Sequence, residues 1–106
     1  MHFQAPRGTI DILPQDQEYW SLMRKASQES SERFGYSRND TPIFENTGLF
    51  NHGVGQSTDI IEKETYTFLD RGGESLTLRP EGTAPVCRAY VEHGMHNLAQ
   101  PVKLFY

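Results

Sequence analysis

The sequence predicts an α+β fold in which a mostly antiparallel sheet is flanked by helices. Residues 14–34 and 83–94 have helical periodicity, and residues 65–79 alternate apolar with polar side chains as a β-hairpin does. The chain has 106 residues, which is the length of one modest domain. It contains no internal repeat, low-complexity tract or linker, so we predict one incomplete structural unit.

The first helix is predicted to run from Pro14 to about Phe34. Pro14 suits a first-turn position, and Asp16 and Glu18 are favourable near the positive end of the helix dipole. Gly35 is a natural stop. We expect most of one helix face to be core, and that face contains Trp20, Met23, Ser27 and Phe34, flanked by Tyr19, Leu22 and Ala26.

The segment after this helix predicts a strand over residues 36–41 and a short helix around Leu49 and Phe50. Farther along, Asp59 and Glu62 have the spacing of a capping box for another short helix. The same polar run also suits a loop that closes over a substrate, so both interpretations stay open.

A β-hairpin is predicted over residues 65–79, with Gly72 and Gly73 in its short loop. Its second strand ends at Pro80, because proline lacks an amide donor and has a fixed φ. Glu81 and Thr83 follow at the junction with the second helix, where side chains meet solvent.

These two residues predict an amine-binding site. The carboxylate of Glu81 can bind an ammonium group through hydrogen bonds worth roughly 1.5–3 kcal/mol each, and the hydroxyl of Thr83 can add a second contact. In the alternative interpretation, Glu81 only complements a helix dipole and Thr83 only caps a turn.

The second helix is predicted from Thr83 to Gly94, with Ala84, Cys87 and Val91 at helical spacing on the side that covers the sheet. Cys87 is the single cysteine, so it forms no internal disulfide. We expect it to be a small core residue and not a nucleophile.

Polar residues of the same helix predict no further site. Arg88 and Glu92 are four residues apart, and we expect an exposed pair worth only about 0.3–0.5 kcal/mol. His93 and His96 have no third ligand at a useful spacing, so we predict no metal site.

Composition is that of a soluble globular protein, with 36% hydrophobic and 23% charged residues. The sequence has no signal-peptide pattern and no apolar run long enough to cross a bilayer, so we expect a cytoplasmic protein without a membrane partner. The net charge of −4, without a basic cluster, argues against this segment being a main nucleic-acid contact.

Several motifs occur together in one order. PRGTIDILP (6–14) is followed by GYSRNDTPIFENTGLF (35–50) and by STDIIEKETYTFLDRGGESLTLRPEGT (57–83), which continues as APVCRAYVEHGM. The chain ends with the strand-like run VKLFY (102–106). This series resembles histidyl-tRNA synthetase, a class II aminoacyl-tRNA synthetase, with the second run similar to motif 1 and the last similar to the opening of motif 2.

The resemblance implies that residues 1–106 are an amino-terminal fragment of a class II catalytic domain. The parent enzyme would activate L-histidine with ATP, assisted by Mg²⁺, and transfer it from histidyl-adenylate to tRNA(His). Glu81 would bind the α-ammonium of histidine and Thr83 would support the same group, neither acting as acid, base or nucleophile. Pro42 matches a proline of the motif 1 homodimer interface. Arg7 also matches a family position, but its role is not assigned.

The main ATP-binding residues of this family, including the arginine that holds the α-phosphate, would lie beyond Tyr106. Because such groups stabilise charge in the transition state, we expect the chain to be inactive alone. We also expect its last strand to lack the neighbours that complete the sheet.

Two other interpretations stay open. The regulatory subunit of ATP phosphoribosyltransferase shares the fold but charges no tRNA, and an intact Glu81 and Thr83 favour the true synthetase over it. The chain could also be a free-standing dimerisation or interaction module, which should form a discrete oligomer.

Overall fold

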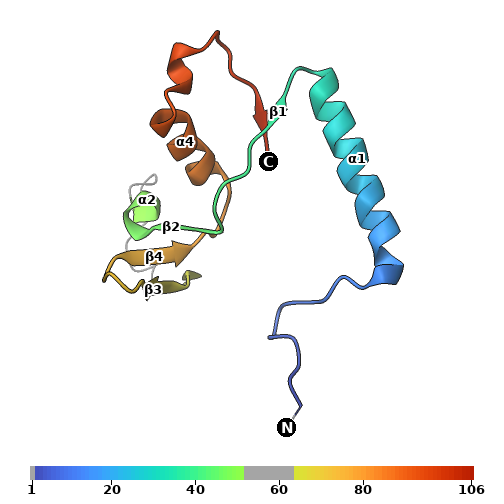
Figure 1. The fold of residues 1–106 in the computed structure, drawn as a ribbon, viewed down its shortest axis with the longest axis vertical. Helices are drawn as coiled ribbons and strands as arrows, with labels where there is room; N and C mark the ends of the chain where they lie inside the picture. Colours follow the sequence, from blue (N-terminus) through green and yellow to red (C-terminus); the bar gives the residue numbers. More distant parts are fainter. Residues whose placement is uncertain (1, 52–63) are drawn as a thin grey trace. The chain divides into compact units, whose positions relative to one another are not determined.

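The computed structural model describes residues 2–51 and 64–106. The chain divides into two compact units, Met1–Tyr36 and Ser37–Tyr106, and each is described by itself (Figure 1). Both contain elements near the predicted positions, and the α+β prediction is confirmed. Asp59 and Glu62, whose spacing suggests a capping box, lie outside the described residues.

The first unit consists of an extended segment, the 3₁₀ turn η1 (Pro14–Asp16) and the helix α1 (Gln17–Arg33). The predicted helix is therefore confirmed, with its first turn tightened to 3₁₀ geometry. The helix ends at Arg33, and Gly35 follows it with a φ of +82°, which is readily adopted only by a residue without a Cβ. The amide of Gly35 donates to the carbonyl of Glu32 at 3.0 Å, which satisfies one of the last free carbonyls.

The apolar face of α1 is not core in the described chain, so that expectation is wrong. No residue of the helix is buried, and Leu22 and Met23 are 66% and 64% exposed. The reason is that the first unit has only an extended segment beside the helix and no second layer to exclude water.

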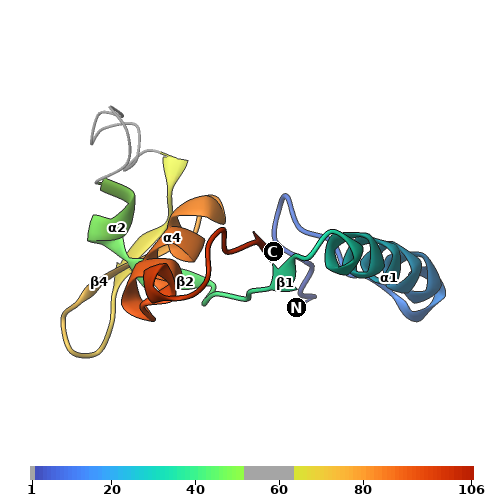
Figure 2. The same cartoon turned by 90° about the horizontal axis from the view of Figure 1, so that it is seen from above.

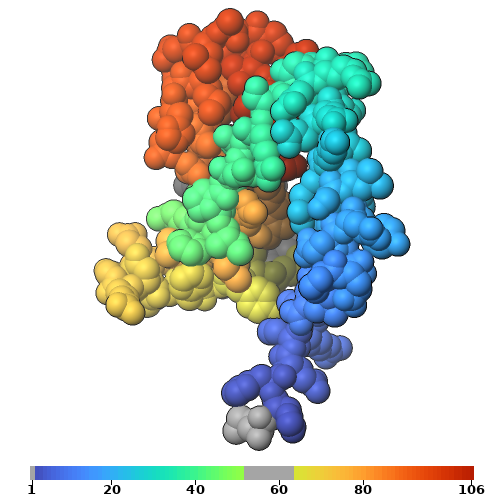
Figure 3. Space-filling view, turned by 45° about the vertical axis from the view of Figure 1, so that its right-hand side comes forward, coloured from blue at the N-terminus to red at the C-terminus, as the bar shows by residue number. Residues whose placement is uncertain are grey.

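The second unit contains a three-stranded antiparallel sheet in the order β2-β4-β3. Its strands are β2 (Phe44–Asn46), β3 (Thr67–Leu69) and β4 (Ser75–Leu78). The last two form the predicted hairpin, which stands out from the surface of this unit (Figure 3, yellow).

The hairpin loop is held by Asp70. Its Oδ1 accepts hydrogen bonds from the amides of Gly72 and Glu74 at 2.9 and 2.8 Å. Gly73 has a φ of +88°, which residues with a Cβ rarely adopt. The backbone conformation of the predicted loop therefore explains why a glycine occurs at this position.

A second, two-stranded sheet joins β1 (Ser37–Arg38) and β5 (Leu104–Phe105), which the sequence predicts as strands but not as partners. The two strands are parallel, with Ser37 opposite Leu104. Parallel strands far apart in sequence cannot be paired from local periodicity, because the pairing depends on the whole path of the chain between them.

The helices of this unit are α2 (Thr47–Asn51) and α4 (Thr83–Glu92), followed by the 3₁₀ turn η2 (Met95–Asn97). The helix α2 lies against both α4 and β4 (Figures 1 and 2). Among the described residues, no helix has the length and apolar character that a bilayer span requires.

The buried face of α4 differs from the predicted one. Pro85 and Ala89, four residues apart, are buried, whereas Cys87 is exposed and Val91 is 69% exposed. A helix turns by about 200° over two residues, so a side chain midway between two inward ones points outward. The expectation that Cys87 belongs to the core is therefore wrong.

Hydroxyl groups link the sheet to α2 in the interior. Thr77 is fully buried, and its Oγ1 lies 2.8 Å from Oγ1 of Thr67 and 2.9 Å from Oγ1 of Thr47. Thr47 also contacts the hydroxyl of Ser75 at 2.7 Å. These contacts provide the hydrogen bonds that buried hydroxyls need, and they join β3, β4 and α2.

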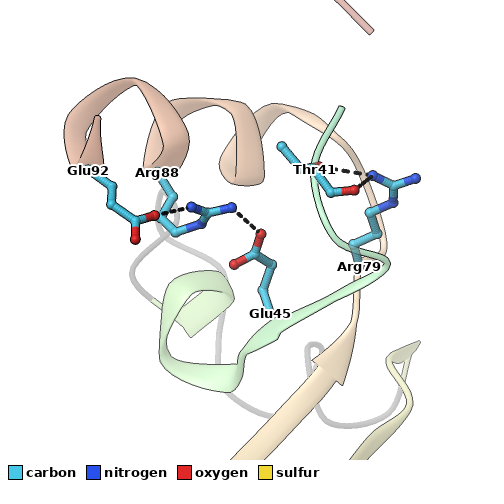
Figure 4. Close-up of polar contacts among 5 residues, drawn as sticks. All are labelled: Thr41, Glu45, Arg79, Arg88 and Glu92. Carbon is cyan, nitrogen blue, oxygen red and sulfur yellow. Dashed lines mark hydrogen bonds and ion pairs between the residues drawn. The ribbon is translucent and has the colours of Figure 1, made fainter. Parts of the chain in front are cut away.

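A charged contact joins β2 to α4. Nη2 of Arg88 donates to Oε1 of Glu45 at 2.8 Å, and the side chain of Glu45 is only 8% exposed (Figure 4). Arg88 also binds Glu92. The hydrogen bond with Glu45 raises the pKa of the Arg88 guanidinium, while burial opposes the rise. The prediction of a merely exposed Arg88–Glu92 pair is thus wrong, since Arg88 also crosses to a buried partner.

Removal of the guanidinium in Arg88→Met should leave the Glu45 carboxylate buried without its cation. We expect a local loss of about 2 kcal/mol, below the full value for a buried pair because Arg88 is 28% exposed. Amide hydrogen exchange in β2 and α4 of the intact protein should become about 30-fold faster. Glu92→Gln, which removes only the exposed partner, should change it by less than about threefold. Equal effects of both variants would contradict this account.

Candidate functional site

A pocket of about 330 Å³ lies in the second unit, beyond the carboxyl end of β4. Three segments form its walls: the chain after β1, the turn between β4 and α4, and the residue that follows β5. The lining residues are Asn39, Asp40, Thr41, Arg79, Pro80, Glu81, Gly82 and Tyr106. The predicted residue Glu81 is among them, whereas Asp40, Arg79 and Tyr106 were not predicted as site residues.

Arg79 fixes one wall of the pocket. Its Nη1 donates to the carbonyl and to Oγ1 of Thr41 at 3.2 and 2.9 Å (Figure 4). Its backbone amide donates to the carbonyl of Ile43 at 2.9 Å. These hydrogen bonds connect the end of β4 to the chain that follows β1. The backbone that leads to Glu81 is therefore held in place.

Glu81 caps the amino end of α4. Its carboxylate accepts hydrogen bonds from the amides of Thr83 and Ala84, the latter at 3.1 Å to Oε1 and 3.3 Å to Oε2. These amides have no acceptor within the helix, so the carboxylate satisfies them and complements the helix dipole. The alternative structural role that the sequence suggests is thus present in the structure.

The capping role leaves room for a ligand. A carboxylate offers about four lone-pair positions, and the side chain of Glu81 is exposed at the pocket. The amide donors hold the carboxylate in one orientation, so the structural role and a ligand-binding role are compatible. A donor-only cation is the class of ligand for which such a carboxylate is suited.

Thr83 begins α4 and is exposed, but it does not line the pocket. Its Oγ1 lies 2.9 Å from the hydroxyl of Tyr106, which does line the pocket. The structure thus brings Tyr106 to the predicted pair. The signal in the sequence was weak, since Tyr106 is only an aromatic residue at the end of a strand-like run.

The charges around the pocket are mixed. Asp40 and Glu81 contribute carboxylates and Arg79 contributes a guanidinium. Asp40 accepts a hydrogen bond from Nε of Arg38 at 3.2 Å, in an exposed pair. Glu81 has no ion-pair contact among the described residues within 4.0 Å. Of the two carboxylates, Glu81 is therefore the one whose charge a cationic ligand would meet unpaired.

Other predicted residues lie away from this pocket. Pro42 is exposed between β1 and β2, and Arg7 is exposed in the extended segment of the first unit. His93 and His96 are exposed after α4. Within residues 2–51 and 64–106, no three histidine, cysteine or acidic side chains are grouped so as to hold a metal ion.

Comparison with known proteins gives a consistent result. The family model described as histidyl-tRNA synthetase matches residues 8–106. A histidine–tRNA ligase from Dehalococcoides mccartyi is 61% identical over 104 residues, which are 98% of this chain and 25% of the relative. One from Moorella thermoacetica is 59% identical over 101 residues, 95% of this chain and 24% of the relative. The chain spans about a quarter of the length of these curated relatives.

Two solved structures are also similar. The apo histidyl-tRNA synthetase of S. aureus has a TM-score of 0.81 and 44% identity over 97% of this chain and 24% of its own. A Bacillus halodurans protein, described as an ATP phosphoribosyltransferase regulatory subunit/histidyl-tRNA synthetase, has a TM-score of 0.73 and 26% identity, over 98% of this chain and 26% of its own.

The cap formed by Glu81 can be tested by Glu81→Ala. Loss of the carboxylate should leave the amides of Thr83 and Ala84 without an acceptor and destabilise the first turn of α4 by about 1 kcal/mol. Amide exchange in α4 of the intact protein should then be about fivefold faster. Glu81→Gln keeps an oxygen acceptor and should have a smaller effect. Unchanged exchange in the alanine variant would mean that the carboxylate does not cap the helix.

Proposed function

The chain belongs to the histidyl-tRNA synthetase family, and we propose that it forms the amino-terminal part of the class II catalytic domain of a histidine–tRNA ligase. This part would extend from motif 1 to the start of motif 2. Identities of 59–61% to histidine–tRNA ligases over nearly the whole chain support the proposal.

The reaction of the whole enzyme would proceed in two steps. The carboxylate of L-histidine attacks the α-phosphate of ATP, which forms histidyl-adenylate and releases pyrophosphate. The terminal hydroxyl of tRNA(His) then attacks the carbonyl of the adenylate, which forms the ester and releases AMP. Both steps require the amino acid to be held with its carboxylate free to react, so its ammonium group is the natural point of attachment.

We assign the α-ammonium of histidine to the pocket beside Glu81. The observation that carries this proposal is the Glu81 carboxylate, which the amides of Thr83 and Ala84 orient at the edge of a pocket of about 330 Å³. Thr83 would support the same group. Both residues bind and orient the substrate, and neither transfers a proton or forms a covalent bond.

ATP and Mg²⁺ would be bound mainly by residues of the whole enzyme that follow Tyr106 in sequence. Mg²⁺ in such sites is usually held by one or two carboxylates together with substrate phosphates.

The whole enzyme should be a cytoplasmic homodimer, with α1 and the region of Pro42 at its interface. The exposed apolar side chains of α1, among them Leu22 and Met23, support this proposal. An apolar helix face that stays in contact with water is unfavourable, and a second copy of the chain would cover it.

A role as a regulatory subunit of ATP phosphoribosyltransferase is less well supported. The Bacillus halodurans protein whose description includes that role is 26% identical to this chain, against 61% for the Dehalococcoides mccartyi histidine–tRNA ligase. Histidine-dependent exchange of pyrophosphate into ATP by the whole protein would separate the two functions, because only the ligase forms an adenylate.

In the whole enzyme, Glu81→Gln should raise the KM for histidine in pyrophosphate exchange by roughly 10- to 100-fold. The neutral amide loses the charge-assisted contact with the ammonium group but keeps an oxygen for the helix amides. Glu74→Gln, at an exposed position before β4, makes the same chemical change away from the pocket and should leave the KM unchanged. An unchanged KM in Glu81→Gln would refute the assignment of the ammonium group.

Leu22→Asp should convert the whole enzyme from dimer to monomer, because a carboxylate on the apolar face of α1 would be desolvated in the interface. Sedimentation equilibrium measures the change in mass. Asp11→Asn, at an exposed position in the extended segment before η1, should leave the mass unchanged. A dimer of unchanged stability in Leu22→Asp would exclude this face from the interface.

A further inference from the structure

The parallel pairing of β1 and β5 places Tyr106 at the pocket. The amide of Ser37 donates to the carbonyl of Lys103 at 3.0 Å, and the amide of Asn39 donates to the carbonyl of Phe105 at 2.9 Å. Tyr106 directly follows Phe105, the last residue of β5, so the hydrogen bonds of this strand set the position of its backbone. Asn39 also lines the pocket. The hydrogen bond between Asn39 and Phe105 therefore connects the wall formed by the chain after β1 with the wall formed by Tyr106.

The ring of Tyr106 packs directly on Gly82. A Cβ added to Gly82 would lie 2.7 Å from Cε2 and 2.9 Å from Cδ2 of the tyrosine ring, closer than real contacts allow. The φ of Gly82 is −101°, a value that any residue can adopt. Glycine is therefore required at this position to leave space for the ring of Tyr106, and not for its backbone conformation. The close approach brings the phenol hydroxyl to the first residue of α4.

The contact between the two hydroxyls has a chemical consequence for Thr83. An ammonium group has only donors, so Thr83 can bind it only as an acceptor. The hydroxyl of Tyr106, 2.9 Å away, can accept the Thr83 proton or donate its own. In both arrangements Thr83 keeps at least one lone pair for the ligand, and its hydroxyl is fixed by a partner within the protein.

We propose that Tyr106 is a positioning residue for the substrate ammonium group, acting through the hydroxyl of Thr83. This inference rests on the proposed function, in which Glu81 and Thr83 bind the α-ammonium of histidine. Tyr106 would orient the Thr83 hydroxyl as an acceptor, while Gly82 provides the space for the ring.

The test is Tyr106→Phe in the whole enzyme, which keeps the ring on Gly82 and removes only the hydroxyl. The KM for histidine in pyrophosphate exchange should rise about fivefold, as expected for one hydrogen bond, while the KM for ATP and the Tm stay unchanged. Tyr90→Phe is the matched control. Tyr90 donates to Gln100 at 3.2 Å, away from the pocket, so the same chemical change there should leave both KM values unchanged.

A double-mutant cycle tests whether Tyr106 acts through Thr83. Thr83→Val removes the hydroxyl that Tyr106 orients, so adding Tyr106→Phe to that variant should cause no further rise in the histidine KM. Gly82→Ala should displace the ring and raise the histidine KM by at least as much as Tyr106→Phe. Histidinol, which keeps the amine, should show the same loss of affinity in Tyr106→Phe as histidine does.

Three results would overturn the inference. An unchanged histidine KM in Tyr106→Phe would exclude a role of the hydroxyl. Equal rises in both KM values with a lower Tm would indicate a structural role only, and full additivity with Thr83→Val would exclude action through Thr83. Failure of the proposed function itself gives a different result, because the wild-type enzyme would then show no histidine-dependent exchange at all.

Discussion

The second unit depends on the ion pair between Glu45 of β2 and Arg88 of α4. Among the described residues, the buried apolar side chains are only Phe50, Pro85 and Ala89, so apolar packing gives little directional information about where α4 lies on the sheet. The charge-assisted hydrogen bond that Arg88 donates to Glu45 at 2.8 Å restricts the position of α4 much more narrowly. Because Glu45 is nearly buried, separation of the pair would leave a desolvated carboxylate, and the helix cannot shift without this penalty.

The proposed substrate site follows from this placement. With α4 fixed on the sheet, its first amides lie at the end of β4, where Glu81 accepts their hydrogen bonds. Arg79 binds the same corner to the chain after β1, and the pairing of β1 with β5 brings Tyr106 across to Gly82. The site is thus made by three segments that are distant in sequence, each held by backbone hydrogen bonds or by an anchored side chain.

Local features of this fold were predictable, and features that join distant segments were not. Alternation and glycine placement predict the hairpin, and Gly35 predicts the end of α1, because each signal lies within the element it describes. The partner of Arg88 was missed because helical spacing reveals Glu92 but not Glu45 on another element. The site carboxylate was predicted from its motif, whereas Tyr106 required the strand pairing that only the structure reveals.

The two roles of Glu81 are physically connected. A free glutamate side chain loses as much as about 2 kcal/mol of rotamer entropy when a ligand orders it. The amides of Thr83 and Ala84 order Glu81 before any ligand arrives, so this cost falls on folding and not on binding. The same amides use part of the carboxylate's hydrogen-bonding capacity, which weakens each remaining bond to an ammonium group. A second acceptor beside the carboxylate then becomes important, and the Thr83 hydroxyl held by Tyr106 is in a position to provide it.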